Sequence, residues 1–301
     1  MWRINIIFYS LIITFNIIAI FTSILFFILV VLRRSIVKTD SVCYLVAANS
    51  YIVMIVVSPM FLDMSFHSIY GQLHPDSVFD TWTCRVKSYL MYINGCVYFS
   101  SFLIQSIHRF CRIAHPTRAV LHSFRLYAIL SIGLWVFASL VLLPSLFVGD
   151  IGYLPHDYHC QLPPTNLRGS LIALSLLFII PFILTLICYC YTMYYVRTKT
   201  TALTTINQNR SIRRDIIIMS RLFLLFVFIT AVALPHVLIP IIYASTGYLP
   251  SWVVSFEWLL TLSSLTAVSI LQLFVTPHLR KLFTRTAVIH PTTRQNPTLH
   301  T

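Results

Sequence analysis

Charged side chains are scarce in this sequence: Asp, Glu, Lys and Arg make up 10% of its 301 residues, against about a quarter in an ordinary soluble domain. Only 7 residues are Gly, while 58% are apolar and 14% aromatic. The shortage of charge excludes an ordinary soluble domain, and the apolar content excludes a disordered chain. With a mean hydropathy of +0.83, the sequence predicts a protein that crosses a membrane several times, at roughly 20 apolar residues per helical span.

Seven stretches are long and apolar enough to span a bilayer as helices, and no alternation typical of strands competes with them. They predict an all-α membrane protein. Its bundle of seven transmembrane helices occupies residues 1–285, including a short amphipathic C-terminal helix at 277–285, and a disordered cytosolic tail follows at 286–301. A β-barrel is disfavoured. The predicted spans are about 6–32, 42–66, 84–113, 126–148, 170–196, 216–244 and 252–275.

The Lys and Arg residues are distributed unevenly between the two sets of loops. Seventeen of the 21 fall on the side of the C-terminus, whereas six of the eight acids fall on the side of the N-terminus. Because short cytosolic loops are enriched in Lys and Arg, we expect an extracellular N-terminus and a cytosolic C-terminus in a multi-pass protein of the plasma membrane. The net charge of +13 then reflects topology and contact with anionic membrane lipid, and nucleic acid is not expected as a partner.

Two of the seven Cys residues differ from the rest in position. Most lie inside spans, where Cys acts as a small apolar residue, but Cys84 falls at the outer start of the third span and Cys160 in the loop between the fourth and fifth. Both are on the oxidising side, so a disulfide between them would pin that loop over the helix ends. His156, His159 and Cys160 come nearest to a zinc-ligand cluster. Because a Cys in a disulfide cannot bind zinc, we expect surface histidines and no metal or cofactor.

Several motifs occur in a fixed order along the spans. Arg109 lies 25 residues after Cys84, in the triplet His108-Arg109-Phe110, and Pro116 follows seven residues later. The other motifs are Leu45-Val46-Ala47-Ala48-Asn49 in the second span, Trp135 and Pro144 in the fourth, Pro181 and Tyr189 in the fifth and Pro235 in the sixth. In this order and spacing the chain resembles a rhodopsin-like G-protein-coupled receptor over nearly its whole length. The resemblance implies a signal transducer and not an enzyme.

Departures from the family's motifs point to a divergent member. The acidic residue before the family's Arg is His108 here, and Asn49 stands where the family usually has an Asp that helps to bind sodium. The family's Cys-Trp-x-Pro in the sixth span and Asn-Pro-x-x-Tyr in the seventh are replaced by Val232-Ala233-Leu234-Pro235 and Ser269-Ile270-Leu271-Gln272-Leu273. These losses leave the fold intact, but the activation mechanism is expected to differ in detail.

The residues expected to control activation lie toward the cytosolic ends of the spans. A guanidinium at the end of an apolar helix needs water or an anion, and similarity to the family's inactive-state latch makes Asp215 the expected partner of Arg109. Alternatively, Asp215 only favours the N-terminal dipole of its own helix. Tyr189 is expected to bond the freed Arg109 in the open state, or else to belong to an interfacial aromatic belt. Pro181 and Pro235 permit kinks.

The cytosolic loops form a short, basic and polar surface that could receive the C-terminal helix of a G-protein α subunit. The candidate residues for coupling and switching are His108, Arg109, Phe110, Tyr189, Asp215 and Pro235. His108 replaces a local counter-charge with a group that can itself become positive, so we expect raised basal signalling. A small transporter or channel is the competing interpretation, but the sequence has neither paired charges near the midplane nor an inverted repeat.

The candidate ligand-binding residues gather near the outer ends of the spans: Asp63, Lys87, Met91, Tyr92, Asn94, His236 and Glu257. Met91 occupies the position where amine receptors of the family carry an Asp, and the seventh span has no Lys to hold retinal. Amine and opsin functions are therefore disfavoured. A peptide with polar or basic ends would suit Asp63 and Glu257. The alternative is that these charges are merely solvated at the membrane rim.

Overall fold

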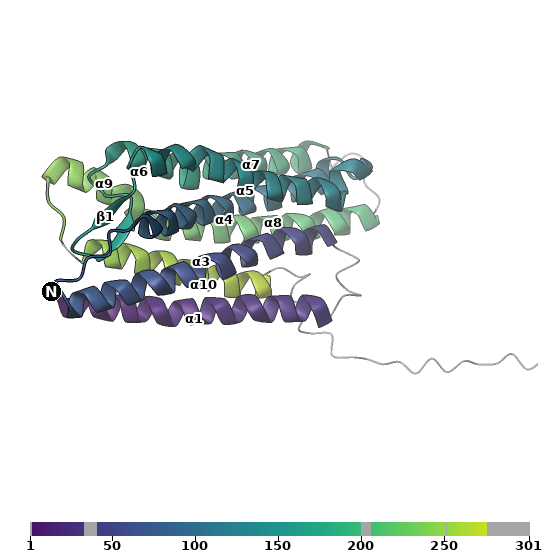
Figure 1. The fold of residues 1–301 in the computed structure, drawn as a ribbon. Coiled ribbons are helices and arrows are strands. Elements are labelled where there is room, and N and C mark those ends of the chain that lie inside the picture. Colours follow the sequence, from purple (N-terminus) through teal and green to yellow (C-terminus); the bar gives the residue numbers. More distant parts are fainter. Residues whose placement is uncertain (1, 33–40, 200–205, 251, 276–301) are drawn as a thin grey trace, which may run out of the picture.

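The computed structural model describes residues 2–32, 41–199, 206–250 and 252–275, with the side chains of all of them except 2, 199, 206–215 and 275. The amphipathic helix predicted at 277–285 and the tail predicted at 286–301 lie outside these residues. The described chain forms one bundle of long helices (Figure 1). The helices are α1 (Trp2–Leu32), α3 (Ser41–Leu73), α4 (Trp82–Ala114), α5 (Phe124–Phe147), α6 (Leu167–Leu174), α7 (Ile180–Lys199), α8 (Ile206–Val232), α9 (Pro235–Thr246) and α10 (Val253–Val275).

Seven helical stretches of this bundle are long and apolar enough to cross a membrane, which confirms the predicted seven-helix fold. They overlap the stretches predicted from hydropathy. Two helices run well beyond these stretches: α8 begins at Ile206, ahead of the span predicted from about residue 216, and α3, which was expected to end near residue 66, continues to Leu73. Its last turns are more polar, but they bury Ser68 and Gly71, so packing extends the helix beyond the apolar run.

Helix α4 lies at the centre of the bundle, between α3, α5, α7 and α8 (Figure 1). It is the least apolar of the candidate spans, yet its apolar window is the most buried of the seven. In contrast, fewer than one-third of the residues in the windows of α1 and α5 are buried, as expected for faces that meet lipid instead of water. Helix α4 itself buries polar side chains, among them Asn94, Gln105 and Arg109.

Two helices are interrupted next to a proline. Before Pro181, residues Ser175–Ile179 form a π-helical turn (η2), closed by a bond from the Ile180 N–H to the Ser175 carbonyl. At Pro235, α8 stops and α9 begins after a short turn in which the His236 N–H bonds the Ala233 carbonyl at 3.1 Å. Proline lacks the N–H of a regular helical bond and its ring crowds the preceding turn, so the interruptions fall where the sequence placed them.

A short β-hairpin covers one end of the bundle. Its strands, β1 (Gly152–Leu154) and β2 (His159–Gln161), are antiparallel, with Tyr153 opposite Cys160. Figure 1 places the N-terminus at this end too. We call it the hairpin end and the opposite one the Arg109 end, because 25 residues of α4, about 37 Å at 1.5 Å per residue, separate Cys84 from Arg109. Hydropathy does not indicate strands this short, and the hairpin is a finding of the structure.

Candidate ligand pocket and activation site

A cavity of about 100 Å³ lies among the helices at the hairpin end. Helices α3, α4, α6, α9 and α10 and the residues of β2 contribute to its walls, which are mostly apolar and aromatic. Among the lining residues are Met91, Tyr92, Asn94, His236, Glu257 and Trp258. Five of the seven predicted ligand-binding residues are thus brought together around one space.

The few polar groups of this cavity are placed at defined points. Glu257 is in ion-pair contact with the imidazole of His236, which also contacts the Thr261 hydroxyl. Asn94 donates from its amide nitrogen to the Leu90 carbonyl at 2.7 Å, but its Oδ1 is buried and has no hydrogen-bond partner among the described residues. An unpaired buried acceptor is costly, so Asn94 Oδ1 and the Glu257 carboxylate are the groups with which a ligand could bond.

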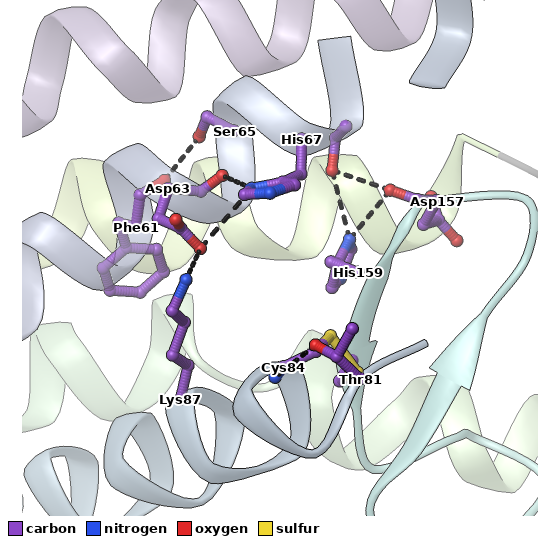
Figure 2. Close-up of polar contacts among 11 residues, drawn as sticks. Phe61, Asp63, Ser65, His67, Thr81, Cys84, Lys87, Asp157 and His159 are labelled. Atoms are coloured by element: carbon purple, nitrogen blue, oxygen red, sulfur yellow. Dashed lines mark hydrogen bonds and ion pairs between the residues drawn. A yellow bond between two sulfur atoms is a disulfide. The ribbon is translucent and has the colours of Figure 1, made fainter. Parts of the chain in front are cut away.

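A second cavity, of about 150 Å³, lies between α3, α4 and the hairpin. The other two predicted ligand-binding residues, Asp63 and Lys87, face each other here at 2.8 Å. Figure 2 shows Asp63 between Lys87 and His67, whose Nδ1 lies 3.5 Å from the same carboxylate oxygen. Both members of the pair are a little over one-third exposed. Met91 lines both cavities, so the seven predicted residues divide into two neighbouring groups.

The predicted disulfide between Cys84 and Cys160 is present and joins the first turn of α4 to β2 (Figure 2). The sequence favours a helix start here, because the Thr81 hydroxyl caps α4 by accepting from the Cys84 N–H at 3.2 Å. The bridge holds the hairpin over both cavities. It also places Gln161 in the wall of the first one, where its Oε1 accepts a 2.6 Å hydrogen bond from the Trp258 indole N–H.

The loop that carries the hairpin is also anchored at its other side. Asp150 accepts a 2.8 Å hydrogen bond from Asn166 and pairs with Arg168 at 2.7 Å. Burial raises the pKa of Asp150, but its bonds to Asn166 and Arg168 outweigh this effect and leave the pKa below its usual value. The loop between α5 and α6 is therefore fixed at both ends over the pocket.

At the Arg109 end, two of the candidate switch residues, His108 and Arg109, are buried inside the bundle. Arg109 is 3% exposed and His108 5%. The His108 ring packs edge-on against Tyr127 of α5 at 4.9 Å, and Phe110 packs against Tyr191 of α7 at 5.3 Å. A small cavity of about 20 Å³, lined by residues of α3, α4, α8 and α10, adjoins Arg109.

Tyr189 faces α8 in this conformation. Its ring stacks on Phe223, with 4.5 Å between centroids, and its hydroxyl lies 3.4 Å from the Ser220 hydroxyl. The predicted latch between Arg109 and Asp215 falls partly outside the described residues, because the side chain of Asp215 is not among them. The backbone of α8, which carries Asp215, does pack against α4.

Comparison with known proteins gives a direct result for the fold just described. A family model for the 7 transmembrane receptor (rhodopsin family) matches residues 25–271, which is most of the chain and all the helices from late α1 to α10. The chain belongs to this family. The receptor is also similar to melatonin receptor type 1B-B of Danio rerio, with 26% identity over 125 residues. That match covers 40% of the receptor and 35% of the relative's length.

Family membership makes the receptor a multi-pass membrane protein, and the predicted resemblance is confirmed. The side chain of Asn49, which stands where the family usually has an Asp that helps to bind sodium, is hydrogen-bonded to two neighbouring helices. Asn49 donates to the Ser101 hydroxyl at 2.7 Å and accepts from the Trp135 indole at 3.0 Å. Both ends of its amide are therefore used by neighbouring helices.

Sequence reasoning missed several residues at the hairpin end of the receptor. Gln161 and Trp258 line the first cavity, and His159, expected on the surface, is 3% exposed and hydrogen-bonded to Ser68 and Gln161. For His159 and Gln161 the available signal was their position beside Cys160: residues next to a Cys that is tied to the start of the third span must lie over the centre of the bundle. Trp258 lies in α10, and no pattern in the sequence indicated it. Among the described residues, no group of His, Cys, Asp and Glu has the geometry of a metal site.

Proposed function

We propose that the receptor binds an extracellular ligand in the cavity at the hairpin end and passes the signal to a heterotrimeric G protein at the Arg109 end. The observation that carries this proposal is the pairing of a buried, apolar cavity with unsatisfied polar groups at one end of α4 with a buried Arg109 at the other. Helix α4 runs from the first cavity to Arg109, so a displacement of α4 at the cavity can be transmitted to Arg109.

The proposed orientation puts the hairpin outside the cell. Seventeen of the 21 Lys and Arg residues then face the cytosol, in accord with the enrichment of these residues in cytosolic loops and near anionic lipid. The same orientation exposes the Cys84–Cys160 disulfide to the oxidising compartment in which such bonds persist.

For the ligand, we propose a peptide that inserts one end into the cavity. A volume of about 100 Å³ suits a terminal residue better than a whole peptide, and a terminal ammonium or basic side chain would meet Glu257. Asp63, the other acid expected to bind the peptide, is paired with Lys87. It would serve at the entrance, where a second residue of the peptide could exchange with Lys87. A small aromatic ligand is the alternative that the similarity to a melatonin receptor favours.

For activation, we propose that Arg109 on α4 and Asp215 on α8 hold the cytosolic ends together until the ligand binds. Opening would then turn Tyr189 from Ser220 toward Arg109, with the break at Pro235 as the pivot. The proposed mechanism needs the two conformations to differ by only a few kcal/mol. His108, which supplies no carboxylate beside Arg109, would leave the closed state less favoured than in relatives with an acid there.

The test is a screen of peptides, melatonin and lipids against cells that express the full chain with a promiscuous G protein. We expect a peptide to raise second-messenger output, and Glu257→Gln to weaken the response more than Asp76→Asn, an exposed loop acid. A response to melatonin with none to peptides would replace the peptide by the small ligand. A solute flux or current without any second-messenger response would contradict the receptor function itself.

A further inference from the structure

A group of buried polar side chains lies beneath the hairpin, outside the first cavity. It joins Tyr9 of α1, Ser68 of α3, Asp157 and His159 of the hairpin and Ser255 of α10, all of them less than one-tenth exposed. The proposed ligand and switch residues do not include any of them. Figure 2 shows Asp157 beside His159, and His159 lines the second cavity together with Asp63, His67 and Lys87.

His159 is held between two hydrogen-bond acceptors. Its Nδ1 lies 3.0 Å from the Asp157 carbonyl oxygen, which already accepts the Ser68 hydroxyl at 2.7 Å. Its Nε2 lies 3.3 Å from Gln161 Oε1. That atom must be an oxygen, because the Trp258 indole donates to it and an indole N–H cannot accept.

A neutral His159 can satisfy both of its ring nitrogens, because the Ser68 hydroxyl lies 3.2 Å from Nδ1 and can donate to it. The Nε2–H then donates to Gln161 Oε1. The ring is therefore placed to be neutral, and the place for an additional proton is on Asp157.

The carboxyl group of Asp157 has a place for a proton. Asp157 is 4% exposed, and its Oδ1 has no hydrogen-bond partner among the described residues. Burial, together with the nearby Glu257, raises the pKa of Asp157 to about 7. Burial lowers the pKa of His159 below its usual value. The Asp157 carboxyl therefore takes up a proton near neutral pH, while the ring of His159 stays neutral.

The other titratable groups around the pair leave this balance in place. From α10, Glu257 faces both residues, but it contacts His236 of α9. From α3 and α4, Asp63, His67 and Lys87 form their own ion-pair group across the second cavity. From α1, the Tyr9 ring meets His159 edge-on at 6.3 Å. The uncompensated charge of the group is therefore the Asp157 carboxylate.

We infer that the Asp157 carboxyl is a proton-binding site through which mild extracellular acid stabilises the closed conformation of the receptor. A proton on this carboxyl neutralises a charge whose Oδ1 is buried and is bonded by no described residue. The conformation that buries this carboxyl also buries Arg109. Acid therefore lowers basal signalling. This consequence rests on the proposed function, whereas proton binding itself does not.

The signalling test uses external pH itself as the probe. Basal second-messenger output is measured at pH 8.0, 7.4 and 6.5 in cells expressing the full chain, with untransfected cells subtracted and surface expression matched. We expect output to fall about threefold from pH 8.0 to 6.5, within the tenfold per unit that one proton allows. Asp157→Asn, an isosteric mimic of the protonated acid, should give low output at every pH. His67→Gln, a change to a half-exposed histidine in the wall of the same cavity, should follow the wild type.

A second measurement separates the proton site from the receptor function. The midpoint of thermal unfolding of the purified receptor is followed by tryptophan fluorescence from pH 8.5 to 5.5. Below pH 7 the folded receptor holds a proton on Asp157 that the unfolded chain has lost, so this contribution to stability falls as pH rises to about 7 and is constant above it. The lowered pKa of His159 acts in the opposite direction, because its contribution is lost as pH falls below its usual 6.5. The midpoint of Asp157→Asn minus that of wild type should therefore rise from pH 5.5 to about 7 and then stay constant. The same difference for His159→Gln should fall from pH 5.5 to 6.5 and then stay constant.

The outcomes are distinguishable. If both variants keep the wild-type pH profile of unfolding, the proton site is wrong. A signalling response to acid of the opposite sign would overturn the link to the closed conformation. Absent basal signalling with the predicted unfolding profiles would count against the proposed function and leave the proton site standing.

Discussion

The indole N–H of Trp135 donates a hydrogen bond to Oδ1 of Asn49, and the two atoms are 3.0 Å apart. This bond joins α5 to α3, and the amide nitrogen of Asn49 extends it to Ser101 of α4. Ser101 in turn donates to the Val97 carbonyl at 2.7 Å. Three helices are thus connected through one buried carboxamide, which uses its donor and its acceptor at the same time.

Breaking this connection should destabilise the receptor. Asn49→Leu leaves the Trp135 N–H without its acceptor inside the bundle, at a cost of about 1–3 kcal/mol. Trp135→Phe removes the donor and should cost about as much, but the double variant should cost less than the sum of the two. Thermal unfolding of the purified receptor in detergent measures all three. Strict additivity would mean that the bond contributes nothing to stability.

A close approach between Gly71 and the hairpin gives a second prediction. A Cβ atom at Gly71 would lie 2.1 Å from Cγ of Tyr158, whereas one at Gly133 would meet nothing within 4 Å. Tyr158 has a positive φ of 57° in the turn between the strands, which is unfavourable for a bulky residue and limits how far the turn can adjust. Gly71→Ala should therefore displace the hairpin and reduce thermal stability and surface expression.

The matched control is Gly133→Ala, which makes the same change in a helix with open space around it. It should leave stability the same or slightly higher, since Ala is the better helix former. Equal effects of the two substitutions would show that the hairpin does not need the close contact at Gly71.

The sequence allowed the helices to be predicted because each span is an apolar run that hydropathy detects without knowledge of its neighbours. Cys84, Arg109 and Pro235 were also placed correctly, because each sits at a fixed distance from a helix end. The extension of α3 to Leu73 was missed, since its last turns are buried by the hairpin and not by lipid. Three-residue strands carry too little pattern to be predicted at all.

The sequence places the candidate ligand-binding residues near one end of their spans, but it does not contain their pairings. Asp63 and Glu257 looked equivalent as acids near the outer ends of their spans, yet the first pairs with Lys87 and the second contacts His236. Which partner an acid finds depends on how far each helix is rotated, and no spacing along the chain contains this information. His159 was expected on the surface because it falls in a loop between two spans, but the disulfide holds that loop over the bundle and His159 is buried.

Loss of the disulfide gives a third prediction. Cys84→Ala with Cys160→Ala frees the hairpin from α4 and should cost about 2–5 kcal/mol, seen as a lower midpoint of thermal unfolding and lower surface expression. Cys190→Ala, which removes an exposed free thiol from α7, is the control and should change neither. A double variant as stable as the wild type would mean that Asp150 and Arg168 alone hold the loop in place.

The final prediction concerns His108 and the restraint on its neighbour Arg109. The His108 side chain is 5% exposed and packs against Tyr127, so a carboxylate placed there would be largely desolvated and strongly attracted to the adjacent guanidinium. His108→Asp should therefore favour the conformation in which Arg109 is buried and lower basal second-messenger output, by roughly three- to tenfold for a gain of about 1 kcal/mol. His108→Asn removes the same ring without adding charge and serves as the control, because it should not lower the output. Both are measured without ligand at equal surface expression. Basal output that is unchanged by the Asp variant, or lowered equally by Asn, would show that a counter-charge at this position does not restrain Arg109.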